Sequence, residues 1–368
     1  MHRKFKILIS GGGTGGHVFP AIAIADALKG RNPDADILFV GACGRMEMER
    51  VPAAGYEIVG LPVAGFQRRL TFKNVTFFFK LIASMLKARR IVRTFNPDVA
   101  VGVGGYASGP VLRAASALGI PTLLQEQNSY PGVTNKILAR KAIRICVAYP
   151  GMERFFPPSK IVLTGNPVRK KLLASVDHKE ACKELGLEEN KQTILVIGGS
   201  LGAGSINNGI LKGTGQIRKR DDVQLLWQCG KYYFEELNNV IGEKEIPNIT
   251  LVPFISQMDL AYRVADVVVS RAGAGTISEL AILGKASVLV PSPNVAEDHQ
   301  TKNAMALVKE GAALLVPDHE TEDELVNKSL GLLNDKKYRK QLEEKIRLFA
   351  HPQSAEQIAE EIEQIADM

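Results

Sequence analysis

The sequence predicts an α/β protein with two similar domains, each built on a parallel sheet. The glycine-rich stretch GGGTGGHVFP at residues 11–20 follows an apolar run and precedes an Ala-rich stretch, as expected where a buried strand turns sharply into a helix. Residues 191–211 repeat this pattern in the second half of the chain. A chain of 368 residues is also longer than a single hydrophobic core usually supports, so two domains are expected.

Short apolar runs alternate with helical stretches along both halves, which predicts βαβ units and helices on both faces of each sheet. In the first half the expected strands are residues 6–10, 37–41, 98–103, 122–125 and 144–148. In the second half they are residues 193–197, 224–228, 250–254, 266–270, 287–291 and 313–316.

Gly165 and Pro167 interrupt the alternation between the two halves. We therefore expect an N-terminal domain over residues 1–167, a C-terminal domain over residues 168–350 and a final helix within residues 351–368. This helix is expected to pack on either domain, including back on the N-terminal one.

Composition and charge narrow the classes of protein. The four cysteines are scattered, which fits a reducing cytosol and neither a disulfide scaffold nor a structural zinc site. The basic N-terminus lacks the long apolar run of a secretory signal, and no apolar run reaches the roughly 18 residues of a transmembrane helix. The first 167 residues hold 22 Lys and Arg against nine Asp and Glu, so this half is expected to meet an anionic partner. Without a nucleic-acid recognition motif, an acidic membrane surface is favoured over nucleic acid.

Residues 74–93 combine an apolar stripe at helical spacing with lysines that recur every seven residues. One interpretation is a crossover helix whose stripe packs on the sheet. The other is an interfacial helix on anionic lipid, since apolar burial and attraction to acidic headgroups add. The residues concerned are Lys73, Val75, Phe78, Phe79, Lys80, Ile82, Met85, Leu86 and Lys87.

The first glycine turn matches the dinucleotide fingerprint only formally. A nicotinamide enzyme needs an acidic residue at the end of the second strand, whereas the first one here, Glu47, falls later in an expected helix. Asp34 and Asp36 resemble a metal-binding pair but precede their strand, so we interpret them as part of a turn. His17 lies within the turn, where a histidine is a reasonable general base for a sugar hydroxyl.

Two further segments have both a structural and a functional interpretation. Residues 102–110 form either a tight turn with Ser108 as a helix N-cap or part of a rim that accepts a pyrophosphate. Thr276 and Glu279 have the spacing of a capping box, and Glu279 also stands where ribose hydroxyls are commonly bound.

Seven motifs, spread over nearly the whole chain, resemble the MurG family of peptidoglycan N-acetylglucosaminyltransferases, within glycosyltransferase family 28. They are GGGTGGHVFPAIAIADAL, GVGGYASGP, EQN, GNPVR, GGSLGA, GAGTISEL and DHQTKNA. The resemblance implies a GT-B fold, with two Rossmann-like domains that face an interdomain cleft. It also implies a peripheral protein on the cytoplasmic face of the cell membrane.

The implied reaction moves N-acetylglucosamine (GlcNAc) from UDP-GlcNAc to the 4-hydroxyl of N-acetylmuramic acid (MurNAc) in undecaprenyl-pyrophosphoryl-MurNAc-pentapeptide, called lipid I. The product, lipid II, is the disaccharide precursor of the cell wall. The transfer inverts the stereochemistry by direct attack, and the family uses no metal or other cofactor. Cell-wall synthesis proteins are possible further partners.

By the same resemblance, His17 is implied as the base, with Glu126 as a second candidate for proton handling. The acceptor's pyrophosphate is expected at Gly104, Gly105 and Tyr106. Gln125 departs from the histidine of some family members at this position. The implied UDP-GlcNAc-binding residues are Thr14, Gly15, Gly16, Asn128, Arg169, Ser200, Ile255, Ala274, Gly275, Thr276, Ile277, Ser278, Glu279 and Gln300.

Two alternatives stay open from the sequence. One is another GT-B glycolipid transferase, for example one that acts on diacylglycerol. The other is a non-catalytic membrane module that binds a nucleotide or a glycolipid.

Overall fold

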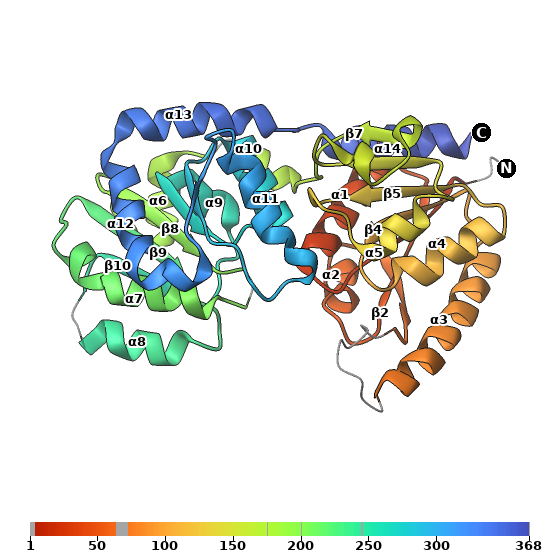
Figure 1. Ribbon diagram of the computed structural model, residues 1–368, viewed down its shortest axis with the longest axis horizontal. Coiled ribbons are helices and arrows are strands. Elements are labelled where there is room, and N and C mark those ends of the chain that lie inside the picture. Colours follow the sequence, from red (N-terminus) through yellow and green to blue (C-terminus); the bar gives the residue numbers. More distant parts are fainter. Residues whose placement is uncertain (1–3, 64–72, 175, 200, 244–245, 368) are drawn as a thin grey trace. The chain divides into compact units, whose positions relative to one another are not determined.

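The computed structural model describes residues 4–63, 73–174, 176–199, 201–243 and 246–367. The chain forms two compact units. Unit 1 comprises Met1–Arg169 and His351–Met368, and unit 2 comprises Lys170–Ala350. The division falls two residues beyond the expected one, and the C-terminal segment belongs to unit 1. Figure 1 shows each unit as a sheet flanked by helices.

The sheet of unit 1 has its strands in the order β3-β2-β1-β4-β5-β6-β7, with every pair parallel. The strand order reverses between β1 and β4, which is where open α/β sheets bind ligands. The strands are β1 (Lys6–Gly11), β2 (Asp36–Ala42), β3 (Glu57–Leu61), β4 (Val99–Gly104), β5 (Thr122–Glu126), β6 (Arg144–Val147) and β7 (Ile161–Leu163).

The sequence prediction missed β3 and β7, which are the two edges of this sheet. β3 contains an exposed glutamate and a glycine, and β7 has three residues, none of them buried. Edge strands bury less surface than central ones and therefore carry a weaker apolar pattern.

Helices cover both faces of this sheet. Ile7 and Ile9 of β1 pack toward a core that includes α1 and α14, whereas Leu8 packs toward the core beneath α3, α4 and α5. This division follows from the two-residue repeat of a strand. The helices are α1 (Gly15–Arg31), α2 (Glu47–Ala53), α3 (Lys73–Phe95), α4 (Ser108–Ala117), α5 (Val133–Leu138) and α14 (Ser354–Ala366).

α14 fastens the end of the chain to unit 1. Its Ile358 and Ile362 are fully buried in the core shared with α1. Glu361 pairs with Arg144 of β6 at 3.0 Å, and Glu363 pairs with Arg31 of α1 at 2.9 Å.

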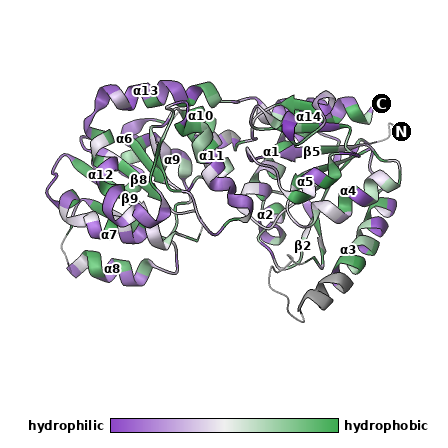
Figure 2. Cartoon of the chain, in the orientation of Figure 1, coloured by the Kyte–Doolittle hydropathy of each residue, from purple (hydrophilic) through white to green (hydrophobic). Residues whose placement is uncertain are grey.

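α3 presents two different faces in its described part. Ser84, Ala88 and Val92 are buried at successive turns, whereas Ile82 and Leu86 are 56% and 67% exposed. Figure 2 shows hydrophobic and hydrophilic residues alternating along this helix. The interpretation that packs the apolar stripe on the sheet is therefore wrong for Ile82 and Leu86, because small side chains form the buried face. The side chains of Lys73, Val75, Phe78 and Phe79 lie outside the described residues.

Unit 2 repeats the architecture with the parallel strand order β10-β9-β8-β11-β12-β13, which reverses between β8 and β11. The prediction of two parallel α/β sheets is confirmed. The strands are β8 (Gln192–Ile197), β9 (Val223–Gln228), β10 (Ile249–Val252), β11 (Val267–Ser270), β12 (Ser287–Leu289) and β13 (Leu314–Leu315). The helices are α6 (His178–Leu185), α7 (Gly204–Arg218), α8 (Phe234–Glu243), α9 (Met258–Val264), α10 (Ala274–Leu283), α11 (His299–Val308), α12 (Thr321–Asn334) and α13 (Lys336–Ile346).

Candidate active site

The first glycine turn joins β1 to α1 at the point where the strand order of unit 1 reverses. Thr14 is the N-cap of α1, and its Oγ1 lies 3.2 Å from Nδ1 of His17 in the first turn of that helix. The imidazole is only partly buried. The N-terminus of a helix favours negative charge, so the structure combines a titratable ring with an anion-attracting helix end.

The second glycine turn, between β4 and α4, is built directly against the first. A Cβ atom at Gly105 would stand 2.2 Å from the backbone oxygen of Gly12, and one at Gly104 would stand 2.6 Å from Cδ2 of His17. Both residues also have positive φ, +94° at Gly104 and +85° at Gly105. Only glycine fits this close approach, and Gly104 thus lies against the His17 ring.

Ser108 holds the two turns together, and its expected role as a side-chain N-cap is wrong. α4 begins at Ser108 itself, without a side-chain capping bond. The hydroxyl instead lies 2.7 Å from the backbone oxygen of Ser10 and 2.8 Å from that of Gly104. Tyr106, beside this turn, is 55% exposed and therefore accessible to a ligand.

Glu126 ends β5, and nitrogen donors surround its carboxylate. Oε1 accepts bonds from the backbone and side-chain nitrogens of Asn128, at 3.0 and 3.2 Å. Oε2 accepts from Nδ2 of Asn135 at 2.8 Å and from the backbone of Gly132 at 3.3 Å. Burial raises the pKa of Glu126, and these four donors oppose that shift. The residue is 2% exposed, so the carboxylate holds its own loop.

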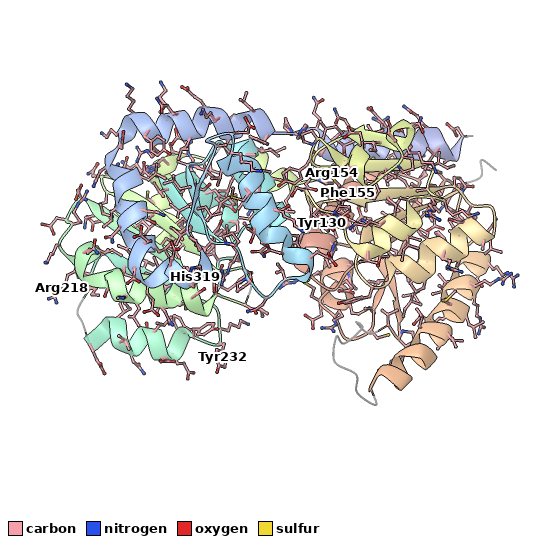
Figure 3. The ribbon with its side chains drawn as sticks, in the orientation of Figure 1. Tyr130, Arg154, Phe155, Arg218, Tyr232 and His319 are labelled. Carbon is pink, nitrogen blue, oxygen red and sulfur yellow. The ribbon has the colours of Figure 1, made fainter. Side chains whose placement is uncertain are left out.

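A ring–ring contact and a cation–π contact of Tyr130 fix the next part of this loop. The rings of Tyr130 and Phe155 meet edge to face with centroids 5.0 Å apart, as Figure 3 labels them, and Nζ of Lys136 lies 4.0 Å from the Tyr130 centroid. Sequence reasoning missed Asn135, because an isolated asparagine in a helix carries no recognisable signal.

The neighbouring Gln125 is fully buried, and its Nε2 donates to Oδ1 of Asn166 at 2.9 Å. Asn166 in turn donates to the backbone of Gln127 at 3.0 Å, so the segment expected as a domain seam is tied to β5. Arg169, the last residue of this part of unit 1, has its guanidinium 5.3 Å from the centroid of the Phe19 ring on α1.

In unit 2, Glu279 lies on α10, which follows β11 at the reversal of the strand order. Its Oε2 accepts a bond from the hydroxyl of Tyr262 at 2.9 Å. The capping-box interpretation is wrong: the N-cap is Gly273, so Thr276 is already inside the helix. Ser278 donates to the backbone oxygen of Ala274 at 3.0 Å. The first turn of α10 is formed by Ala274, Gly275, Thr276 and Ile277.

Sequence reasoning gave no role to Arg271, which connects the loops on either side of this strand reversal. Its guanidinium donates to Oγ of Ser205 in α7 at 2.8 Å and to the backbone oxygen of Val290 at 3.2 Å. Asp318 pairs with the same guanidinium and accepts a bond from Ser205 at 2.6 Å. This network fixes the start of α7 relative to the loop that precedes α10.

Three other expected donor-binding residues belong to different loops of unit 2. Ile255 is buried just after β10. Oε1 of Gln300, in the first turn of α11, accepts a bond from the backbone of Ser292 at 2.9 Å. Ser200 lies outside the described residues.

Within residues 4–63, 73–174, 176–199, 201–243 and 246–367, no three His, Cys, Asp or Glu side chains gather as a metal-binding group. No helix in the same ranges has the length and apolar character needed to cross a membrane.

Two family models match this chain over most of its length. The family model for the glycosyltransferase family 28 N-terminal domain matches residues 7–147, and the one for the glycosyltransferase family 28 C-terminal domain matches residues 193–361. The chain belongs to glycosyltransferase family 28. The resemblance inferred from the motifs is thereby confirmed, and this family 28 chain is a glycosyltransferase.

Curated relatives and solved structures agree with this assignment. A protein of Bacteroides fragilis is 56% identical over 363 residues, covering 98% of this chain and 96% of the relative. One of Bacteroides thetaiotaomicron is 53% identical over 369 residues, covering 100% and 99%. Both are named UDP-N-acetylglucosamine--N-acetylmuramyl-(pentapeptide) pyrophosphoryl-undecaprenol N-acetylglucosamine transferase.

The crystal structure of Acinetobacter baumannii MurG is similar to this family 28 chain with a TM-score of 0.78 and 29% identity, over 98% of this chain and 100% of that one. A UDP-GlcNAc 2-epimerase from Neisseria meningitidis has a TM-score of 0.71 at 14% identity, covering 98% of this chain and 100% of the epimerase, and shares the fold alone. The predicted GT-B class of fold, with two Rossmann-like domains, is confirmed.

Proposed function

We propose that this chain transfers GlcNAc from UDP-GlcNAc to the 4-hydroxyl of MurNAc in lipid I, which gives lipid II. The observation that carries the proposal is the 56% identity, over 98% of the chain, to a relative named as that transferase. The glycine turns at the strand reversals of both units support it, because such turns suit phosphate-bearing substrates.

Unit 1 handles the acceptor in this proposal. Gly104, Gly105 and Tyr106 take its pyrophosphate, and His17 removes the proton of the attacking 4-hydroxyl. The oxygen then attacks the anomeric carbon from the side opposite UDP, which inverts that centre. Glu126 acts as a positioning residue, because its carboxylate is enclosed by the loop that carries Asn128.

Unit 2 holds the donor. Glu279 binds the ribose hydroxyls, Ile255 borders the uracil and Gln300 contacts the sugar. UDP gains negative charge as it departs, and a fixed guanidinium or a helix N-terminus stabilises that charge. Ser200 and the first turn of α10 have this role in unit 2. Arg169 has it in unit 1, from which Thr14, Gly15, Gly16 and Asn128 also approach the donor.

The deciding experiment supplies the purified chain with radiolabelled UDP-GlcNAc, the muramoyl lipid and a chelator. The lipid-linked disaccharide is the expected product, and its formation under chelation supports a metal-independent reaction. Label on diacylglycerol but not on the muramoyl lipid would favour another glycolipid transferase. UDP binding without turnover on either acceptor would favour a non-catalytic module.

We expect Glu279→Ala to weaken UDP-GlcNAc binding about 10- to 100-fold, because hydrogen bonds to a charged group contribute roughly 1.5–3 kcal/mol. Calorimetric titration with UDP-GlcNAc measures the change. Tyr262→Phe is the matched control, since it removes the 2.9 Å bond to Glu279 but leaves the carboxylate. Unchanged affinity in Glu279→Ala would refute the ribose assignment.

We also propose that the outer face of α3 attaches the protein to the cytoplasmic face of the cell membrane, as a peripheral contact. Ile82 and Leu86 are exposed on this face, one turn apart. Exposed Lys80, Arg89 and Arg90 lie on the same helix, so apolar insertion and attraction to anionic headgroups act together. Lys87 is exposed as well, but its Nζ donates to the backbone oxygen of Gly60 at 2.8 Å. The sequence also suggests Lys73, Phe78 and Phe79 for this contact, but their side chains lie outside the described residues.

Replacing both Ile82 and Leu86 with Ser is expected to reduce binding to vesicles that contain anionic lipid, with activity on a soluble acceptor analogue retained. Vesicle co-sedimentation measures the binding. Leu348→Ser, which alters a leucine of unit 2 that is also strongly exposed, is the control and leaves vesicle binding unchanged. Full vesicle binding by the double variant would exclude this surface.

A further inference from the structure

The carboxylate of Glu47, at the start of α2, is enclosed between the first glycine turn and the end of β2. The residue is fully buried. Oε2 accepts a bond from the backbone nitrogen of Gly13 at 2.9 Å, and Oε1 accepts one from that of Ala42 at 2.9 Å. Two backbone amides, one from each strand end, therefore converge on one buried carboxylate.

The surrounding glycines leave room for this carboxylate. A Cβ atom at Gly12 would stand 2.2 Å from Oε1 of Glu47, and one at Gly41 would stand 2.5 Å from its Cγ. Gly12 belongs to the glycine stretch that suggests a phosphate-binding turn. A side chain at Gly12 would collide with Glu47, which explains the glycine at this position without a bound phosphate.

A carboxylate bound by backbone amides occupies the kind of position that a phosphate takes in an anion-binding turn. The Gly13 amide is committed to Glu47, and the charge of Glu47 opposes a second anion beside it. We propose that Glu47 is an internal anion that replaces phosphate at Gly13 and sets the shape of the first turn, so that the acceptor's pyrophosphate binds at the second turn instead.

The first turn transmits this shape to the residues of the reaction. The backbone oxygen of Gly12 lies against Gly105, and the ring of His17 lies against Gly104, as the 2.2 and 2.6 Å approaches of a Cβ atom show. A shift of Gly12 and Gly13 therefore displaces His17 and the second turn together. Glu47 touches no reacting atom, so it is a positioning residue, and this part of the inference rests on the proposed transfer reaction.

The first test compares Glu47→Gln with Glu49→Gln, which alters an exposed glutamate on the same helix. The carboxamide of Glu47→Gln directs a donor at one of the two amides, so the turn shifts. We expect kcat to fall roughly 10- to 100-fold, since displacement of a reacting group by about 1 Å has effects of this size. The dissociation constant for uridine stays unchanged, because its proposed contacts, Glu279 and Ile255, both belong to unit 2.

The pH profile separates positioning from mere stability. Glu47 is bonded to the turn that precedes His17. Removing its negative charge makes the imidazolium form of His17 less favourable, so the acidic limb of the kcat profile moves to lower pH in Glu47→Gln. Glu47→Asp keeps the charge and retains the position of the limb. Wild-type kcat and pH profile in Glu47→Gln would overturn the positioning role.

The second test needs no activity and no variant. Pyrophosphate is titrated into the wild-type protein labelled with ¹⁵N-glycine, and the amide resonances are followed by NMR. We expect the largest shifts at Gly104 and Gly105, with a smaller one at Gly13 that follows from the contact between the two turns. A saturable shift at Gly13 larger than those at Gly104 and Gly105 would show that phosphate reaches that amide and would overturn the inference, even if the chain transferred no sugar to any acceptor.

Discussion

We expect His17→Gln to lower kcat for GlcNAc transfer roughly 10²- to 10⁴-fold, the range typical for loss of a general base. UDP-GlcNAc binding is expected to stay unchanged, because the proposed nucleotide contacts of unit 2 do not involve this residue. Glutamine keeps a polar side chain beside Thr14 and Gly104 but cannot take a proton from a hydroxyl at neutral pH. Single-turnover kinetics with saturating donor and acceptor measure the chemical step directly.

The control for His17→Gln is His319→Gln. His319 belongs to unit 2, its side chain is 82% exposed, and Figure 3 labels it on that unit. This variant should retain wild-type kcat. A histidine base must be neutral to act, so wild-type kcat/KM should also fall at acidic pH, and this limb should be absent from His17→Gln. If His17→Gln kept more than about a tenth of wild-type kcat, an effect too small for a general base, the proton would have another acceptor.

The sequence predicted the fold wherever a continuous apolar run is followed by a glycine turn. β1, β4, β8 and β11 are buried central strands, and each is followed by a turn that the motifs identify. The edge strands β3 and β7 lack that apolar pattern and were missed. The same limit applies to α3, where the buried face consists of Ser84, Ala88 and Val92, because small side chains fill a close contact without an apolar stripe.

The candidate site was predictable in its glycines and His17 but not in the groups that support them. Glu47 is bonded to Gly13, 34 residues away, and Arg271 to Ser205, 66 residues away. Asn135 is bonded to Glu126, nine residues before it. No local period or spacing marks such a partner. The sequence also suggested a capping box of Thr276 and Glu279. The observed N-cap is Gly273, so Glu279 does not cap this helix.

The second large effect is expected for Glu126→Gln. This substitution should lower the free energy of unfolding of unit 1 by roughly 2–4 kcal/mol. All four donors point at the carboxylate oxygens, two at each. A carboxamide places its own NH₂ group against two of these donors, so both are buried without an acceptor. Urea denaturation of the variant and of Glu153→Gln, an exposed glutamate of the same unit, measures the difference.

The kinetics of Glu126→Gln distinguish the two roles considered for this residue. If the carboxylate holds the loop, Asn128 is displaced, so the KM for UDP-GlcNAc rises together with the loss of stability. If Glu126 moves a proton, kcat falls while the free energy of unfolding stays at the wild-type value. The geometry favours the first outcome, because a 2% exposed carboxylate with four donors has no lone pair directed at a substrate hydroxyl. A stable variant with a large loss of kcat would instead indicate that Glu126 transfers a proton in the reaction.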